Sequence, residues 1–230
     1  LKEILNILLE KNDISHKELF KLFIFLYKEK IIKKYKENGS DYSEINIFID
    51  EKIIINALKK ITFRDHKIEK ILIKLREHIC NLVSENKVDL SNNQIIFLIA
   101  LGEQCFLNEF VYSSSKKENI SVSKIINRCI NGEMNETNIS ILSCYLPLYK
   151  LLDQILLLKS FNSSDQSFKE LTKLQITEPL EEIELSQNIK KLGSINDEVS
   201  QRVKSQYEEN PYPRWRYGSH KKNQKISIIQ

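Results

Sequence analysis

Glycine and proline are scarce in this chain, at 5 and 4 of 230 residues. Enzymes acting on soluble metabolites usually carry a glycine-rich phosphate or cofactor turn, a nucleophile elbow or a metal cluster. None of these patterns occurs, and no strand, glycine turn and helix follow one another as a nucleotide-binding unit requires. We therefore predict that the chain is not a complete enzyme. The glycines are isolated from one another: Gly39, Gly102, Gly132, Gly193 and Gly218.

Cysteine and histidine are equally sparse, with 4 of each and no Cys-x-x-Cys pair. Widely spaced cysteines in apolar helical contexts are typical of small buried hydrophobic side chains in a reducing compartment. Because neither residue type clusters, we predict no metal site. The cysteines are Cys80, Cys105, Cys129 and Cys144.

Long hydrophobic runs are absent as well. The longest, Leu22–Tyr27 and Ile95–Leu101, are far shorter than the ~20 apolar residues of a membrane-spanning helix. No signal peptide is recognisable. These features predict a soluble cytoplasmic protein with no membrane partner. The chain opens on Leu1 rather than methionine, which indicates a fragment.

Positive charge is concentrated at the C-terminal end. Residues 210–230 hold 5 of the 35 basic residues and none of the 31 acidic ones, so the preceding 209 residues carry a net charge of −1. A short tail of this kind neutralises only a few phosphates. We therefore do not expect a nucleic-acid partner. The basic residues are Arg214, Arg216, Lys221, Lys222 and Lys225.

Apolar residues recur at helical spacing along most of the chain, which predicts an all-α, irregular multi-helix bundle over residues 1–209. A non-helical C-terminal tail follows at 210–230, because each proline after Asn210 favours extended geometry in the residue before it. A loop with a short extended piece at 45–49 interrupts the bundle. The predicted helices cover residues 1–11, 15–38, 50–61, 66–85, 92–112, 120–131, 137–160, 164–174, 178–186 and 196–208.

The helix boundaries rest on capping residues and breakers. Ser15 (with Glu18), Asp50, Asp65 and Ser91 are N-cap residue types. Helix 92–112 is apolar nearly all round, which predicts the buried centre of the bundle. Pro147 is expected to kink or divide helix 137–160, and Gly193 to separate the last two helices.

Gln104, Asn108 and Tyr112 form a polar stripe on this otherwise apolar helix, at positions i, i+4 and i+8. Buried amides require hydrogen-bond partners. Two interpretations follow. The stripe is either a structural network that meets loops or another helix, or the lining of a ligand pocket.

A second constellation is Gln206-Tyr-Glu-Glu-Asn-Pro-Tyr-Pro-Arg-Trp215, which places two tyrosines, the only tryptophan and an arginine around a rigid Pro-x-Pro turn. Its stiff backbone and large rings suit a surface that presents aromatic faces in fixed directions. Arg214 beside Trp215 has the chemistry to stack or to bind an anion. The alternative interpretation is a linker whose rings cover the end of the bundle.

The stretches Thr177–Glu182 and Ser200–Trp215 together resemble a segment of a bacterial protein family. In that family the segment precedes a class I S-adenosylmethionine-dependent methyltransferase domain, often in chains that begin with tetratricopeptide repeats. Three further pieces agree with the family in the same order: Ile68–Arg76, Gln104–Tyr112 and Tyr145–Leu148. The glycine-rich cofactor-binding turn of that domain is missing from these 230 residues.

The resemblance implies a methyltransferase for the parent protein and, for this chain, the helical accessory region ahead of the catalytic domain. No cofactor is expected in the chain itself, S-adenosylmethionine is implied for the parent, and the expected partner is the parent's own C-terminal domain. In the parent, Tyr207, Tyr212, Arg214 and Trp215 are expected near cofactor or substrate, as a lid or as packing between domains. The alternative function is a non-catalytic helical scaffold that binds other proteins.

Overall fold

The computed structural model describes residues 1–37, 48, 51–188 and 197–209, with the side chains of 207–209 outside the description. All the regular elements in these residues are helical and none is a strand, which confirms the all-α prediction. The α-helices are α1 (Lys2–Glu10), α2 (Leu19–Glu37), α4 (Lys52–Lys60), α5 (His66–Ser84), α6 (Asn92–Leu107), α7 (Lys116–Ile130), α8 (Glu136–Leu142), α9 (Gln166–Thr172), α10 (Glu178–Asn188) and α11 (Glu198–Glu209). Shorter helical turns cover His16–Glu18, Leu148–Leu151, Leu156–Ser160 and Lys173–Thr177, the last of them a π turn.

Helix α6 is the centre of the molecule, as its apolar sequence predicted. Every residue from Phe97 to Leu107 is buried, and α6 packs against α4, α8 and α9. Its start is fixed by Ser91, whose backbone N–H donates to the Gln94 side chain over 2.8 Å. Such a cap satisfies a donor that the first helical turn leaves without a partner. The core therefore grows outward from one helix that has no solvent-facing side over its last three turns.

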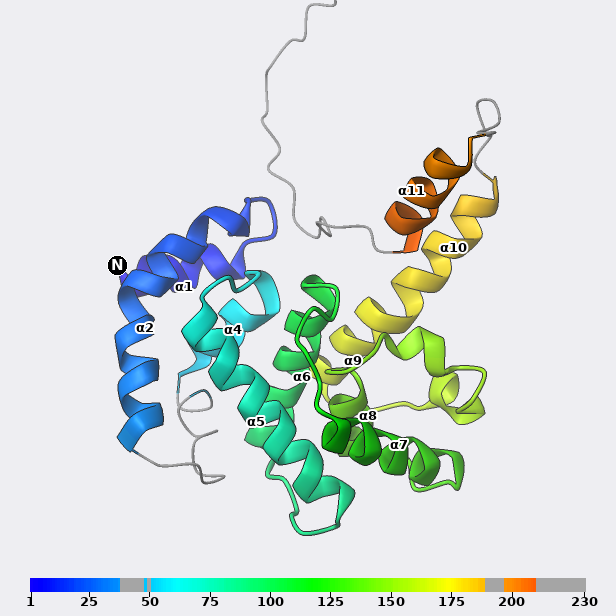
Figure 1. Cartoon of the computed structure of the whole chain (residues 1–230). Helices are drawn as coiled ribbons and strands as arrows, with labels where there is room; N and C mark the ends of the chain where they lie inside the picture. The colour runs from blue at the N-terminus through cyan, green and yellow to red at the C-terminus, as the bar shows by residue number, and fades with distance from the viewer. Residues whose placement is uncertain (38–47, 49–50, 189–196, 210–230) are drawn as a thin grey trace, which may run out of the picture.

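The other helices are arranged irregularly around α6 (Figure 1). Helices α1 and α2 lie together with α4 at one end, while α5 packs along α7 and α8. Helix α10 projects away from the body in Figure 1, and its residues from Glu181 to Asn188 are exposed. Helix α11 lies beside α10 in Figure 1, so these two helices protrude from a compact core.

Helices α6 and α8 approach so closely that only glycine fits at one contact. A Cβ atom built on Gly102 would lie 2.0 Å from Ser143 Oγ, well inside van der Waals contact. Ser143 Oγ itself donates to the carbonyl of Ser140 over 2.6 Å. Gln175, in the π turn, donates to the carbonyl oxygens of both Gly102 (2.9 Å) and Ser143 (3.1 Å) and so closes the contact from a third side.

Helix α6 is shorter than predicted, since it ends at Leu107 rather than at residue 112. Glu109 and Phe110 adopt left-handed φ values of 57° and 55°. The Phe110 N–H then donates back to the Cys105 carbonyl over 2.8 Å, a closure typical of helix C-termini. Tyr112 consequently lies in the loop that follows α6 and is not part of a helical stripe.

Other predicted boundaries were also wrong. Helix α7 begins at Lys116 and not at 120, because Ser115 and Glu118 form a capping box. The run predicted over 137–160 is divided, as expected from Pro147: α8 ends at Leu142 and Pro147 precedes the first of two 3₁₀ turns, which replace the helix predicted beyond it. Ser15 precedes a 3₁₀ turn and makes no capping hydrogen bond.

The cap predicted at Asp65 is confirmed, because its carboxylate accepts from the backbone N–H groups of Lys67 and Ile68. The residue at the start of α4 is Glu51, one place after the predicted Asp50. Asp50, Gly193 and most of 45–49 lie outside the described residues. Within 45–49, Phe48 is helical rather than extended and is fully buried, with its ring 5.3 Å from that of Phe97.

Candidate functional site

The most densely connected buried group is the guanidinium of Arg76, on α5, whose residue is 3% exposed. Its Nη2 lies 3.1 Å from Glu118 Oε1 and donates to the Ser113 carbonyl over 2.7 Å. Nη1 donates to the Cys144 carbonyl over 3.3 Å. These partners come from α7, from the loop before it and from the end of α8. One side chain therefore ties four segments together.

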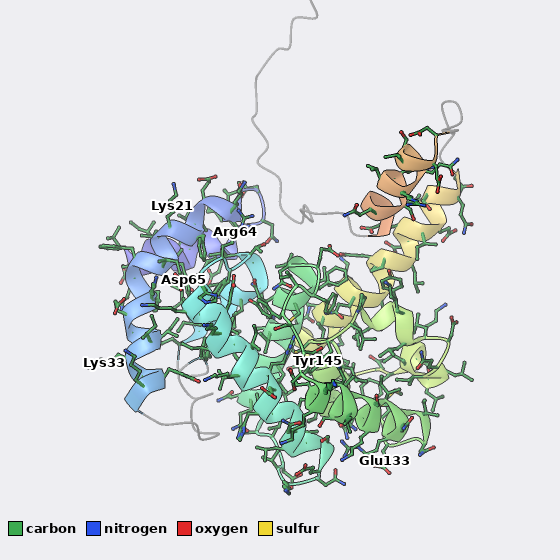
Figure 2. The ribbon with its side chains drawn as sticks, viewed as in Figure 1. Lys21, Lys33, Arg64, Asp65, Glu133 and Tyr145 are labelled. Carbon is green, nitrogen blue, oxygen red and sulfur yellow. The ribbon has the colours of Figure 1, made fainter. Side chains whose placement is uncertain are left out.

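Tyr145 completes this cluster. Its ring centroid lies 4.3 Å from the Arg76 guanidinium carbon, and its hydroxyl donates to Glu118 Oε1 over 2.8 Å. Figure 2 shows Tyr145 near the middle of the helical body. Burial raises the pKa of Tyr145 far above its ordinary value of 10.0, so the hydroxyl remains a neutral donor. We call Arg76, Glu118 and Tyr145 the Arg76 cluster.

Three thiols surround the cluster. Burial raises the pKa of Cys80 to about 11 and raises that of Cys144 well above its ordinary value of 9.0. At Cys105 burial acts in the same direction, but the Cys144 thiol and the Arg76 guanidinium outweigh it and lower the pKa. All four cysteines are free and buried, which confirms the prediction of small buried hydrophobic side chains. A nucleophilic role needs access, and the completely buried Cys105 has none.

Gln104, the first residue of the predicted stripe, has a structural role. Its Oε1 accepts from the Phe63 N–H over 2.8 Å, and its Nε2 donates to the carbonyls of Leu58 and Ile61, each over 2.7 Å. These are backbone groups at the end of α4 and in the turn that leads to α5. The amide thus satisfies three buried backbone groups that the helix terminus leaves open. This is the network interpretation of the stripe.

Asn108 and Tyr112 differ from Gln104. They are 5% and 7% exposed, yet neither the Asn108 amide nor the Tyr112 hydroxyl has a hydrogen-bond partner among the described residues. Burial raises the pKa of Tyr112 above its ordinary value of 10.0, and the charges of Cys105 and Glu69 add to this effect. Asn108 lies close enough to lower that pKa, but the two side chains do not meet in hydrogen-bond geometry.

The other predicted site residues are not placed. Tyr212, Arg214 and Trp215 lie outside the described residues, as does the side chain of Tyr207, which belongs to α11.

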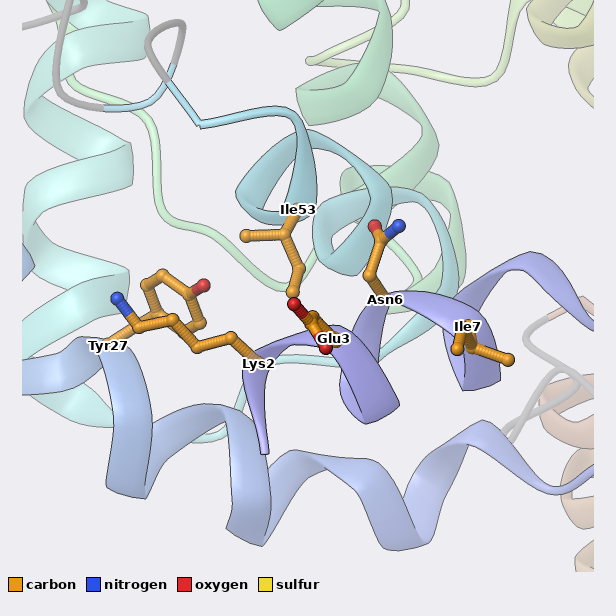
Figure 3. Close-up of a pocket in the computed structure, with 6 residues that line it drawn as sticks. All are labelled: Lys2, Glu3, Asn6, Ile7, Tyr27 and Ile53. Carbon is orange, nitrogen blue, oxygen red and sulfur yellow. The ribbon is translucent and has the colours of Figure 1, made fainter.

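A hollow of about 480 Å³ opens between α1, α2 and α4 (Figure 3). Within it the ammonium of Lys2 lies 5.4 Å from the centroid of the Tyr27 ring. A cation over an aromatic face is a favourable contact in its own right. The hollow gathers no set of groups for acid–base or nucleophilic chemistry. Its lining residues are Lys2, Glu3, Asn6, Ile7, Tyr27 and Ile53.

Two kinds of feature are absent from the described residues. These residues hold no group of three or more histidine, cysteine, aspartate or glutamate side chains arranged to bind a metal ion. No described helix has both the length and the apolar character needed to cross a bilayer.

Sequence reasoning missed the Arg76 cluster, although two signals were present. Arg76 stands four residues after Leu72 and three before Ile79, so a charge interrupts the apolar stripe of α5. Glu118 follows Ser115 at capping-box spacing, and its second oxygen accepts from the Ser115 N–H over 2.7 Å. A charge within an apolar stripe requires a buried partner of opposite sign.

Comparisons of the chain with protein-family models, with curated proteins and with solved structures give no match.

Proposed function

We propose that this chain is a helical accessory region that precedes the catalytic domain of an S-adenosylmethionine-dependent methyltransferase. The proposal rests on the resemblance of residues 177–182 and 200–215 to the segment that adjoins such a domain. It is supported by the contacts of two other resembling pieces, Ile68–Arg76 and Tyr145–Leu148. They are far apart in sequence, yet Arg76 and Tyr145 stack on each other at 4.3 Å.

In this function the chain acts as a rigid structural support for the catalytic domain and does not itself carry out the reaction. A buried, fully hydrogen-bonded network holds its elements in one arrangement. The Arg76 cluster and the Gln104 and Gln175 amides are networks of this kind, and Gln175 ties the base of α10 to the core. The accessory region would thereby set the position of the catalytic domain that follows α11.

The test compares two proteins in calorimetric titrations with S-adenosylmethionine. One is residues 1–230, and the other extends through the rest of the parent reading frame. We expect saturable binding by the longer protein only. Low-micromolar binding by residues 1–230, or a longer protein that binds no cofactor, would contradict the proposal. The reading frame is itself informative, because a strand with a Gly-x-Gly turn soon after Gln230 is expected.

The second candidate is a non-catalytic scaffold, and the surfaces of α10 and α11 favour it. Ile183 and Leu185 on α10 are 44% and 64% exposed, and Val199 and Val203 on α11 are 68% and 45% exposed. Exposed apolar side chains that gather on protruding helices are typical of protein-binding surfaces. Under this alternative, the double substitution Leu185→Ser and Val199→Ser would abolish binding of a partner protein, and no cofactor domain would follow.

A further inference from the structure

The loop after α6 leaves an uncommon combination of groups inside the protein. Asn108 is the C-terminal cap of α6, and the side chains of Asn108 and Tyr112 are more than nine-tenths buried. Their polar atoms Asn108 Oδ1, Asn108 Nδ2 and Tyr112 OH all lack partners among the described residues. A buried polar group without a hydrogen bond costs about 1–3 kcal/mol. Such groups in a folded protein indicate a water, an ion or a ligand that completes them.

The backbone between these two residues is also strained. Glu109 and Phe110 are consecutive non-glycine residues in the left-handed region, with φ of 57° and 55°. Left-handed conformations are uncommon for residues with large side chains. Strain of this kind persists only where the surroundings hold it, and it is concentrated at binding sites. Val111, which follows them, is 72% exposed, so this short loop lies at the protein surface.

The charges around the two residues act in opposite directions. The carboxylate of Glu69 raises the pKa of Tyr112, and the guanidinium of Arg76 lowers it. Arg76 already has Glu118 as its buried counter-ion. Asn108 and Tyr112 are more than nine-tenths buried, so an ionic ligand that entered between them would lose its hydration at a high free-energy cost. The site favours an uncharged molecule.

The hydrogen-bonding groups of the Asn108 carboxamide further restrict the class of ligand. Asn108 offers one acceptor and one donor side by side, and Tyr112 adds a hydroxyl that both donates and accepts. A primary carboxamide presents an N–H and a C=O on one edge, so it can pair with Asn108 through two parallel hydrogen bonds. A trans peptide bond cannot do so, because its N–H and C=O point in opposite directions.

We propose that Asn108 and Tyr112 form a binding site for a small uncharged molecule with a primary carboxamide, covered by the loop from Asn108 to Ser115. The C=O and one N–H of the ligand pair with the Asn108 carboxamide, and its second N–H donates to the Tyr112 hydroxyl oxygen. The strained residues Glu109 and Phe110 mark where this loop opens to admit the ligand.

The experiment is a titration of residues 1–230 with acetamide. Nuclear magnetic resonance monitors the chemical shifts of the Asn108 side-chain amide and of the backbone amides of residues 108–112. N-methylacetamide, a trans secondary amide, and acetate, an anion of similar size, are the comparison probes. We expect saturable shifts with acetamide only. Equal shifts with all three probes, or no saturable shift with acetamide because an ordered water alone fills the site, would overturn the proposal.

Variants locate the binding. Asn108→Asp keeps the shape but replaces the donor with a charge, and we expect acetamide affinity to fall at least tenfold. Tyr112→Phe removes only the hydroxyl, and we expect a loss of several-fold. Tyr112→Phe provides the test if Asn108→Asp fails to fold. The matched control is Asn127→Asp on the exposed face of α7, which should bind like the unmodified chain. Unchanged affinity in Tyr112→Phe or in Asn108→Asp would place the ligand elsewhere and refute the assignment.

Discussion

Arg76 Nη2 and Glu118 Oε1 lie 3.1 Å apart, and the two side chains are only 3% and 2% exposed. Removing one member of a buried ion pair leaves the other charge uncompensated, which costs about 3–5 kcal/mol. Each single variant therefore leaves one buried charge without a partner, whereas the double variant leaves none.

Arg76→Met and Glu118→Leu are each expected to lower the free energy of unfolding by about 3–5 kcal/mol. The double variant should lose less than the sum of the two. Urea denaturation followed by circular dichroism measures all three. The control is Arg202→Met, which breaks an exposed pair with Glu198 on α11 and should cost under about 1 kcal/mol. Additive losses in the double variant would mean that the two charges do not interact.

Gly102→Ala is expected to destabilise the protein by about 1–3 kcal/mol, as overpacking of a core does. The physical reason is the 2.0 Å distance between the added Cβ and Ser143 Oγ. Ser143→Ala removes that oxygen, so the double variant should recover part of the loss in a thermal unfolding experiment. The recovery is only partial because the Ser143 Cβ would lie 3.0 Å away. A double variant less stable than Gly102→Ala would contradict this explanation.

The ion pair between Lys28 and Asp65 predicts an acid-sensitive contribution to stability. Desolvation alone would raise the pKa of Asp65, but the hydrogen bond from Lys28 at 2.6 Å and two backbone N–H groups hold it below its ordinary value of 3.8. A lowered folded-state pKa stabilises the protein above the unfolded value, and this stability is lost as pH falls through the folded pKa.

Asp65→Asn tests this, because asparagine retains the helix cap and removes the charge. Unfolding free energies measured from neutral pH to below 3.8 should fall more steeply for the unmodified chain than for the variant. The matched control is Asp165→Asn, the N-cap of α9, whose carboxylate accepts from the Phe168 N–H. Parallel pH profiles for Asp65→Asn and the unmodified chain would show that the pair contributes nothing.

The tail residues call for experiments in the intact parent. If they form a lid, Arg214→Ala should weaken S-adenosylmethionine affinity about tenfold, or roughly 1.4 kcal/mol, with little change in melting temperature. If they pack between domains, Trp215→Ala should lower stability and leave affinity near normal. Calorimetry and thermal unfolding measure both. Two substitutions that change neither property would identify a passive linker.

Most of the helices could be predicted from hydrophobic periodicity, because a helix buried on one side must repeat its apolar residues at helical spacing. The ends were less predictable. The end of α6 depends on the left-handed residues Glu109 and Phe110, neither of which is a residue type that signals a helix stop. The end of α8 at Leu142 lies next to the tight contact between Ser143 and Gly102, which is a tertiary effect.

The stripe shows how far the candidate site could be predicted. A buried amide requires hydrogen-bond partners, and the Gln104 side chain bonds to backbone groups at the end of α4 and in the turn before α5. Asn108 was assigned to the same helical face, but its position at the helix end gave it a different environment. The assignment of Tyr112 to that face depended on helix length, which periodicity alone does not determine. The Arg76 cluster joins side chains from α5, from α7 and from the segment after α8. The sequence shows only the charge in the apolar stripe of α5 and the capping box of α7, and it does not show that these groups meet.

The π turn at Lys173–Thr177 has a consequence for the direction in which α10 presents its side chains. A π turn takes in one residue more than an α-helical turn, and each residue advances a helix by about 100°. Because Gln175 anchors the turn to α6 and α8, this rotation is locked relative to the core. One residue fewer in the turn would correspond to a rotation of α10 by about 100° about its axis, which would turn Ile183 and Leu185 toward another direction. The number of residues in this turn therefore sets the direction in which α10 presents its apolar side chains, and the insertion or deletion of one codon would change it.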